Sequence, residues 1–319
     1  MNDFHHQHIS VLQKQVVEYV PTSARSMIDG TVGDGGHARA ILTSHPRMKT
    51  LFAIDRDPDA IDRARRTLEK LPHRIVYYIG SYESIPDMLK KEGESGVDAI
   101  LLDLGFSTPQ IDTPERGFSF EDGPLDMRYD RRSGRTAADI LNTFPDEDIE
   151  NLLREYGDER QAKAIARAIG EYRKHQKFSR TKELVECVLS VYRAKLKSTK
   201  EIPWIGGAHP ATRTFQALRI AVNDELGSIT RALPLCLSAL NPNGRLLIIT
   251  FHSGEERIVK QFFKRERRDC ICLPELPTCV CNHKASLRVI TSKGIRADEQ
   301  EQLTNPRSRS ATLRVAEKI

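Results

Sequence analysis

Short apolar runs alternate with amphipathic stretches through the first third of the chain. The apolar runs predict strands at 25–29, 51–55, 74–79 and 98–103. Apolar positions at helical spacing predict helices at 8–20, 36–45 and 58–70. Strands that alternate with helices in this way are typical of an α/β fold, in which crossover helices cover a parallel sheet.

The alternation stops at Ser107. A loop rich in Gly, Pro and Asp runs from there to Asp130, and 136–230 then has helical periodicity almost throughout. We therefore expect an inserted helical domain, which we place at residues 109–214 between a first core segment, 1–108, and a second, 215–319.

Strand character returns in the second core segment. The residues at 241–244, Asn-Pro-Asn-Gly, predict a turn, and a strand is predicted directly after it at 245–251. This strand should complete the sheet begun near the N-terminus. Two further candidates, 286–291 and 311–316, are expected to form an antiparallel pair at an edge of the sheet.

Composition favours a globular protein. The chain has 319 residues, of which 39% are hydrophobic, and a net charge of +5. It has no apolar run near the roughly 20 residues that span a bilayer, and its first residues lack the pattern of a signal peptide, so a cytoplasmic location without a membrane partner is expected. Basic residues cluster at Arg131 to Arg135, 167–182, 260–268 and Arg307 to Arg309. These clusters suit a polyanion-binding surface, with solvated helix faces as the alternative.

A glycine-rich turn follows the first predicted strand, with the sequence Asp-Gly-Thr-Val-Gly-Asp-Gly-Gly-His from Asp29 to His37. Such a turn lets the backbone approach a nucleotide-sized ligand closely, as in Rossmann-like folds. Asp29, Asp55 and Asp103 each end a predicted strand, where such folds bind ligands. The G-x-G-x-x-G fingerprint of dinucleotide sites is missing, and carboxylates suit the cationic S-adenosyl-L-methionine better than a pyrophosphate. Helix capping is the alternative for each single Asp.

The most specific signals are separate motifs spread along the chain, and with them the sequence closely resembles the RsmH (MraW) family, the bacterial 16S ribosomal RNA cytosine-N4 methyltransferases. The matching blocks are the glycine turn, Ala53–Asp57, Asp98–Gln110, Arg116–Phe120, Gly123–Arg128, Arg180–Leu184, His209–Ile220, Thr250–Ser253 and Asn305–Ser310. The resemblance implies a class I, Rossmann-like methyltransferase fold with a helical insert that binds the substrate RNA. It also implies methylation of the N4 amine of a cytidine in the decoding site of 16S rRNA in the small ribosomal subunit, cytidine 1402 in the family.

Carried over position by position, the resemblance places the contacts to S-adenosyl-L-methionine at Gly35, Gly36, His37, Asp55, Tyr82, Asp103 and Gln110. Two positions depart from the family pattern. Tyr82 stands where relatives often have Phe, and Thr108 stands where Ser is usual. Tyr82 keeps a ring that could stack on adenine, although a place in the core is the alternative.

The cytosine amine is a poor nucleophile, so the enzyme must align it and accept a hydrogen bond from it. Asp103 is a candidate acceptor, with service to the cofactor alone as the alternative. Phe106 could stack on an extruded base. His252 is a candidate proton shuttle, or a hydrogen-bonded structural histidine.

Three arginines of the insert region, Arg116, Arg128 and Arg213, are candidate RNA contacts. For Arg213 a bond to an internal carboxylate such as Asp224 is the alternative. Oligomeric state is left open, with a homodimer as one reading.

Four cysteines lie close together near the C-terminus: Cys270, Cys272, Cys279 and Cys281. In a reducing compartment such a cluster favours a structural zinc site over disulfides, while a merely loop-shaping role is the alternative. Cys187 and Cys236 lie in helical apolar patterns and are expected to be small core residues.

Two other functions are compatible with parts of the sequence. A DNA amine methyltransferase would share the chemistry, but it would need a sequence-reading domain that the insert does not show. A non-catalytic ribosome assembly factor would use the fold and its basic helices only to bind RNA. The intact acids and glycines of the cofactor turn speak against it.

Overall fold

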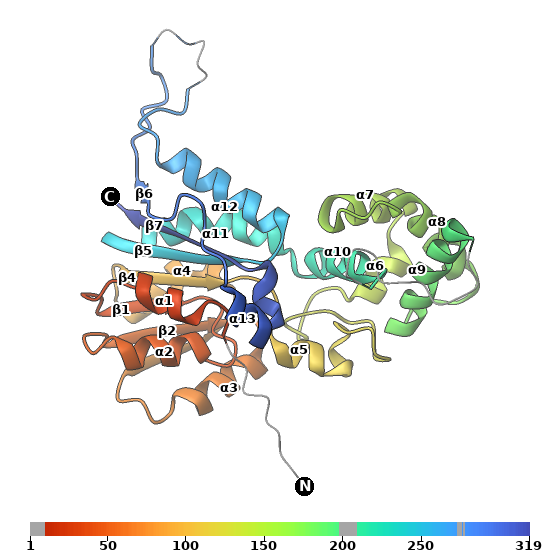
Figure 1. The fold of residues 1–319 in the computed structure, drawn as a ribbon, viewed down its shortest axis with the longest axis horizontal. Helices are drawn as coiled ribbons and strands as arrows, with labels where there is room; N and C mark the ends of the chain where they lie inside the picture. The colour runs from red at the N-terminus through yellow and green to blue at the C-terminus, as the bar shows by residue number, and fades with distance from the viewer. Residues whose placement is uncertain (1–9, 198–208, 273–275, 277) are drawn as a thin grey trace. The chain divides into compact units, whose positions relative to one another are not determined.

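The computed structural model describes residues 10–197, 209–272, 276 and 278–319. The chain divides into two compact units. Unit 1 comprises Met1–Gly105 and Leu226–Ile319, and unit 2 comprises Phe106–Glu225. Both are drawn in Figure 1. No helix among the described residues is long and apolar enough to cross a membrane.

Unit 1 contains a seven-stranded sheet in the order β3-β2-β1-β4-β5-β7-β6. Its strands are β1 (Ser26–Asp29), β2 (Thr50–Asp55), β3 (Arg74–Ile79), β4 (Val97–Asp103), β5 (Leu240–Thr250), β6 (Leu287–Val289) and β7 (Thr312–Lys318). Strands β1 to β5 are parallel, and β7 runs antiparallel to both β5 and β6. The predicted α/β sheet is confirmed, and so is the antiparallel pair at its edge.

Helices cover both faces of this sheet (Figure 1). They are α1 (Gln13–Tyr19), α2 (Gly36–Ser44), α3 (Pro58–Leu68), α4 (Ile85–Glu92), α11 (Glu225–Ala239), α12 (Ser253–Glu266), α13 (Glu299–Thr304) and the short turns η1 (Tyr82–Ser84) and η3 (Pro306–Ser310). Side chains alternate across the strands, so Ala99 and Leu101 of β4 join α1, α2 and α3 in one core, while Ile100 and Leu102 join α4, α11 and α12 in another.

Two boundaries in unit 1 differ from the prediction. Strand β5 begins at Leu240 rather than at 245, so residues 241–244 lie within its bounds, where the register shifts between the pairs Val97↔Leu240 and Ala99↔Arg245. These residues form a bulge in which Asn243 has a left-handed φ of 64°, so the chain turns there as expected, but inside the strand.

Helix α1 is shorter than the predicted 8–20. It begins at Gln13 because Leu12 has a left-handed backbone conformation, with φ 53°, and donates its N–H to the Glu301 carboxylate at 2.6 Å. Of the predicted helix, residues 8 and 9 lie outside the described residues.

Unit 2 is helical. Its elements are α5 (Thr108–Asp112), η2 (Pro114–Arg116), α6 (Ala137–Thr143), α7 (Asp146–Gly157), α8 (Ala162–His175), α9 (Thr181–Leu196) and α10 (Thr212–Asn223). Helix α7 packs against both α8 and α10, and α8 packs against α9. Gly157 allows the close approach of α7 to α10, because a Cβ there would lie 2.5 Å from the Arg213 carbonyl oxygen. The apolar stripes of these helices form one core of their own.

Candidate active site

Three carboxylates lie at one edge of the sheet in unit 1. Asp29, Asp55 and Asp103 are the last residues of β1, β2 and β4. These strands are parallel neighbours in the order β2-β1-β4, so their carboxyl ends meet at the same edge. The prediction that the three acids end successive strands is confirmed.

The glycine turn crosses this edge between β1 and α2. The Gly30 N–H donates to the Leu101 carbonyl at 2.9 Å, and the Val32 N–H donates to the Ile54 carbonyl at 2.9 Å, so the turn is bonded to both neighbouring strands. A Cβ on Gly30 would lie 2.5 Å from Cδ2 of Leu102. Gly35 has φ 81° and caps α2, a left-handed conformation that favours glycine. The turn therefore places glycine backbone, without side chains, at the edge of the sheet.

The environment of the acids is unusual for carboxylates. Burial raises the pKa of Asp29 to about 7, and nearby His37 offsets only part of this effect. Burial likewise raises the pKa of Asp55 to about 6, against the lowering effect of hydrogen bonds from the backbone of Asp57 and Gly33. Raised carboxyl pKa values at a ligand-binding edge are a physical signature of a functional site.

His37 and Asp103 lie side by side in this site. His37 Nε2 is 3.4 Å from Asp103 Oδ2, and the imidazole is buried while the Asp103 side chain is 23% exposed. Within the described part of the chain, both ring nitrogens of His37 and Oδ1 of Asp103 are buried without a hydrogen-bond partner. A buried polar group left unpaired costs about 1–3 kcal/mol, so this arrangement fits a site completed by a polar ligand.

Sequence reasoning did not single out Thr31. Its hydroxyl accepts a hydrogen bond from the Asp103 backbone N–H at 2.7 Å and so joins the glycine turn to the end of β4. Only the position of Thr31 inside the glycine turn could have signalled this role. The contact itself depends on the pairing of β1 with β4, which is distant in sequence.

Tyr82 lies beneath the glycine turn rather than in open solvent. It is 8% exposed and belongs to the core on the α4 side of the sheet. A Cβ on Gly30 would be 3.2 Å from Cβ of Tyr82, and the Arg56 guanidinium stands 5.6 Å from the centroid of its ring. Core packing of Tyr82 is therefore observed, and its stacking on adenine stays a prediction.

His252 caps helix α12. Its Nε2 is 3.1 Å from Oε1 of Glu255, and Glu255 in turn accepts the Phe251 N–H at 2.8 Å. The imidazole is largely buried, with 12% of the side chain exposed. The capping position gives His252 a structural role. Among the described residues its Nε2 is buried without a hydrogen-bond partner, and its role as a proton shuttle stays a prediction.

Two further predicted site residues, Gln110 and Phe106, belong to unit 2. Gln110 is buried and its side chain accepts the Ser107 N–H at 3.0 Å, which closes the capping box of α5. Phe106 is 37% exposed, and the Arg219 guanidinium lies 4.7 Å from the centroid of its ring. Gln110 thus has a structural task besides any contact to the cofactor.

The three candidate RNA contacts are engaged within unit 2. Arg116 is buried and donates to the carbonyls of Arg128 and Tyr129 at 3.2 and 3.0 Å. Arg128 forms a two-pronged pair with Asp126 at 2.7 and 2.9 Å. Arg213 donates to the Asp158 carbonyl. Their binding to RNA stays a prediction.

The four clustered cysteines meet in space in unit 1. Their sulfur atoms all lie within 4.8 Å of one another, and none forms a disulfide. Cys187 is buried in the core of unit 2, and Cys236 is buried in the core on the α4 side of the sheet, as predicted.

A seven-stranded sheet with β7 reversed beside β5, a glycine turn after β1 and acids at the ends of β1, β2 and β4 define an S-adenosylmethionine-dependent methyltransferase with a Rossmann-like fold. The chain belongs to the MraW methylase family, whose sequence profile matches residues 5–319.

Relatives of known name are similar in sequence along nearly the whole chain. A protein named ribosomal RNA small subunit methyltransferase H from Heliobacterium mobile is 44% identical over 320 residues, covering 99% of this chain and 100% of the relative. A protein of the same name from Geobacter sp. is 45% identical over 321 residues, covering 100% of both chains. Among solved structures, an rRNA methylase from Streptococcus thermophilus aligns over 96% of this chain and 93% of its own, with a TM-score of 0.42 and 9% identity.

Proposed function

We propose that this methyltransferase acts on 16S rRNA in the small ribosomal subunit and methylates the N4 amine of a cytidine in the decoding site, cytidine 1402 in the family. The proposal includes a cytoplasmic location, where that subunit is found. It is supported by the relatives named ribosomal RNA small subunit methyltransferase H. The structural observation that carries it is the carboxylate edge, where, among the described residues, the ring nitrogens of His37 and Oδ1 of Asp103 lack hydrogen-bond partners beside the glycine turn.

The residues at this edge fit S-adenosylmethionine. When bound, this cofactor supplies an electrophilic methyl group on a sulfonium, together with ribose hydroxyls and a charged amino acid end. Asp55 would hold the ribose, Gly35 and Gly36 would admit it close to the backbone, and Tyr82 would lie toward the adenine. His37 and Asp103, whose buried nitrogens and oxygen lack partners, would bind the amino acid end. Gln110 would be a further contact to the cofactor.

Asp103 also has the chemistry to act on the substrate. Its unpaired Oδ1 can accept a hydrogen bond from the cytosine amine, which restores electron density to a nitrogen whose lone pair is delocalised into the ring. The exposed part of the Phe106 ring offers a stacking surface to an extruded base. We assign RNA binding to the insert, residues 109–214, with Arg116, Arg128 and Arg213 as its candidate contacts.

The test is methyl transfer to small subunits from a strain that lacks this enzyme. The purified protein is incubated with labelled S-adenosylmethionine, the RNA is digested, and the modified nucleoside is identified by mass spectrometry. N4-methylcytidine at one decoding-site position, lost with Asp103→Ala, is the expected result.

Other outcomes point to the alternatives. Transfer to DNA in preference to small subunits would indicate a DNA amine methyltransferase. Absence of both methyl transfer and cofactor binding would indicate an assembly factor. A separate readout assigns Asp103: if Asp103→Asn lowers only cofactor affinity and leaves the rate of the chemical step unchanged, Asp103 serves the cofactor alone.

A further inference from the structure

The connection between α12 and β6 forms two arms that run side by side away from the sheet (Figure 1). At its base the Ser286 N–H donates to the Glu266 carbonyl at 2.9 Å, and farther out the Ala285 N–H approaches the Asp269 carboxylate at 3.4 Å. Each arm carries two of the clustered cysteines. Cys270 and Cys272 lie on the outgoing arm, and Cys279 and Cys281 lie on the returning arm.

The sulfur positions match a tetrahedral metal centre. The Sγ atom of Cys279 is 3.5 Å from that of Cys270 and 3.6 Å from that of Cys281, and Cys270 and Cys281 are 3.8 Å apart. Four thiolates bound to zinc at about 2.3 Å in a tetrahedron lie about 3.8 Å apart. A disulfide requires about 2.05 Å. The spacing therefore fits four thiolates bound to one metal ion rather than two disulfide bonds.

Backbone amides complete the surroundings of the sulfurs. The Ile271 N–H donates to Cys281, the Cys272 N–H donates to Cys270, and the Val280 N–H donates to Cys272, each at 3.4 Å. Amide donors stabilise the negative charge of thiolates and fix their orientation, as is usual around metal-bound cysteines. Basic residues at 264, 265, 267, 268 and 284 flank the cluster in sequence and can offset the net negative charge of a tetrathiolate centre.

We propose that Cys270, Cys272, Cys279 and Cys281 bind one structural Zn²⁺ that clips the two arms together. Four protein ligands leave no open position, so the metal has no part in methyl transfer. Binding releases the thiol protons to solvent and involves no oxidation or reduction. The proposal stands independently of the RNA substrate, because it concerns only this connection.

The zinc content of the full-length protein, purified under reducing conditions without chelator, tests the site. One zinc per chain is expected by elemental analysis, with a loss of at least tenfold in the Cys270→Ser and Cys281→Ser variants. Cys187→Ser is the matched control, because Cys187 lies in the core of unit 2, and it should keep its zinc.

A second measurement does not depend on variants. Wild-type protein stripped by a chelator should bind one Co²⁺ and develop the absorption bands of tetrahedral cobalt with sulfur-to-metal charge transfer. Failure of the reduced wild type to bind zinc or Co²⁺ would overturn the proposal. So would an intact mass lower by two hydrogens per cysteine pair, which would show disulfides in the protein as purified.

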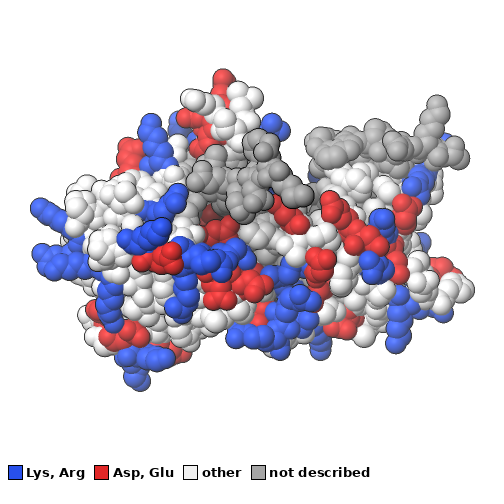
Figure 2. Space-filling view, turned by 90° about the horizontal axis from the view of Figure 1, so that it is seen from below, with Lys and Arg blue, Asp and Glu red and all other residues white. Residues whose placement is uncertain are grey.

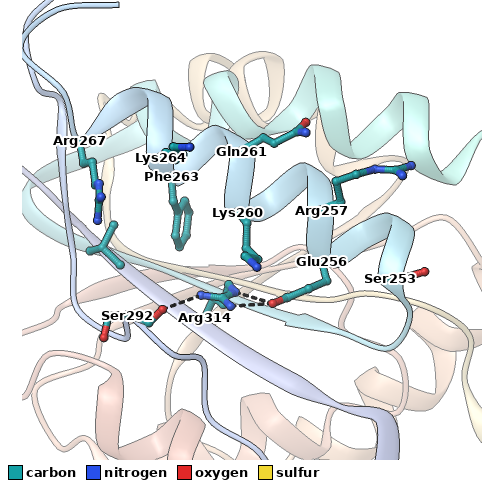
Figure 3. A pocket seen from close by; sticks show the side chains of 11 residues that line it. Ser253, Glu256, Arg257, Lys260, Gln261, Phe263, Lys264, Arg267, Ser292 and Arg314 are labelled. Atoms are coloured by element: carbon teal, nitrogen blue, oxygen red, sulfur yellow. Dashed lines mark hydrogen bonds and ion pairs between the residues drawn. The ribbon is translucent and has the colours of Figure 1, made fainter.

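A different observation concerns a groove along α12, with a volume of about 530 Å³. Figure 3 shows Lys260 and Arg267 directed from α12 into the groove, with Arg314 of β7 facing them. Arg314 is neutralised by Glu256, to which its guanidinium donates at 2.6 and 2.9 Å, and it also reaches the Ser292 carbonyl at 3.3 Å.

Besides Arg314, four cations line this groove: Arg257, Lys260, Lys264 and Arg267. Across the described residues no ion pair involves any of these four. Their spacing of three, four and three residues places them along one side of α12 over about 15 Å. This concentration stands out because acidic and basic side chains are interspersed over the face that Figure 2 shows.

We infer that the groove binds the phosphate backbone of RNA, an inference that rests on the proposed function. A row of unpaired cations over about 15 Å can meet two or three consecutive phosphates of one strand. The aromatic residue of the groove, Phe263, is 3% exposed and belongs to the core, so it offers no ring for stacking a base. Binding here should therefore add affinity without sequence preference.

The salt dependence of binding to small subunits tests the groove, in wild type and in the double variant Lys260→Gln with Arg267→Gln. The slope of log K against log[salt] should fall in magnitude by about 1.5, since each lost phosphate contact contributes roughly 0.7–0.9. The Michaelis constant for subunits should rise with kcat unchanged. Arg265→Gln is the control, because Arg265 lies on the same helix outside the groove and approaches Glu266.

The outcomes separate this inference from the proposed function. If wild type methylates small subunits and the double variant keeps the wild-type slope, the groove inference is wrong and the function stands. If wild type neither binds nor methylates subunits, both fail. If the double substitution weakens binding to anionic lipid vesicles more than it weakens binding to RNA, the RNA assignment is wrong and the groove binds a membrane surface.

Discussion

Replacing Asp29 by asparagine removes a carboxylate that the fold holds out of water. The residue is 1% exposed, and burial raises its pKa from 3.8 to about 7. The folded state therefore holds the Asp29 proton more tightly than the unfolded state does, and ionisation of Asp29 destabilises the fold. The cost is absent below pH 3.8, grows as the pH rises toward 7 and is complete above it.

A shift of about 3 pKa units corresponds to about 4 kcal/mol of unfolding free energy, of which about 2.5 kcal/mol develops between pH 5 and pH 8. Asparagine keeps an oxygen that can accept the Thr31 N–H, as Asp29 does at 3.2 Å. The unfolding free energy of Asp29→Asn should therefore rise relative to that of wild type by about 2.5 kcal/mol from pH 5 to pH 8.

The assay is urea unfolding of the ligand-free proteins at several pH values from 5 to 8. Asp122→Asn is the control, because the Arg180 guanidinium lowers the pKa of Asp122 and its ionisation is complete in both states over this range. The difference in unfolding free energy between Asp122→Asn and wild type should stay constant from pH 5 to pH 8. A difference between wild type and Asp29→Asn that is equally constant from pH 5 to pH 8 would refute the reasoning.

Three further perturbations have defined outcomes. Cofactor binding by the wild type should tighten from pH 6 to pH 8 and release protons, because the pKa values of Asp29 and Asp55 are raised and a cationic ligand favours their ionised forms. Calorimetry in buffers of different ionisation enthalpy measures the number of protons released. Binding without proton release would contradict the prediction. Arg219→Met should destabilise the protein by about 3–5 kcal/mol in urea unfolding, since it strands the buried Glu225 carboxylate that Arg219 holds at 2.8 Å, and Arg219→Met with Glu225→Leu should recover part of the loss. His252→Asn keeps a capping side chain on α12 and should retain methyl transfer within about tenfold, whereas loss of a hundredfold or more, with Tm unchanged, would show that His252 carries the proton.

The sheet and its three acids were predictable because buried parallel strands appear in sequence as continuous apolar runs, and Asp29, Asp55 and Asp103 directly follow such runs. Carboxyl ends of parallel strands share an edge, so strand direction alone brings the acids together. The bulge in β5 was not predictable, because Asn-Pro-Asn-Gly has the composition of a turn and only the pairing of β4 with β5 keeps it within a strand.

The features that the sequence did not predict depend on contacts between segments that are distant in the chain. The Thr31 hydroxyl meets the Asp103 N–H only because β1 and β4 are neighbours. Likewise, the sequence shows a run of basic residues at 260–268, but not that Arg314 pairs with Glu256 while Lys260 and Arg267 line a groove. Charge pairing depends on which side chains the fold brings together.

The position of β7 in the sheet has a consequence for the order in which the chain can fold during synthesis. Strand β7 spans Thr312–Lys318 and lies between β5 and β6, with almost every residue buried. Until it leaves the ribosomal exit tunnel, β5 presents an unpaired edge that is open to association with other chains. Translation adds roughly 5–20 residues per second, so β5 waits several seconds for its partner. A nascent chain of this protein is thus a natural client for chaperones that shield strand edges.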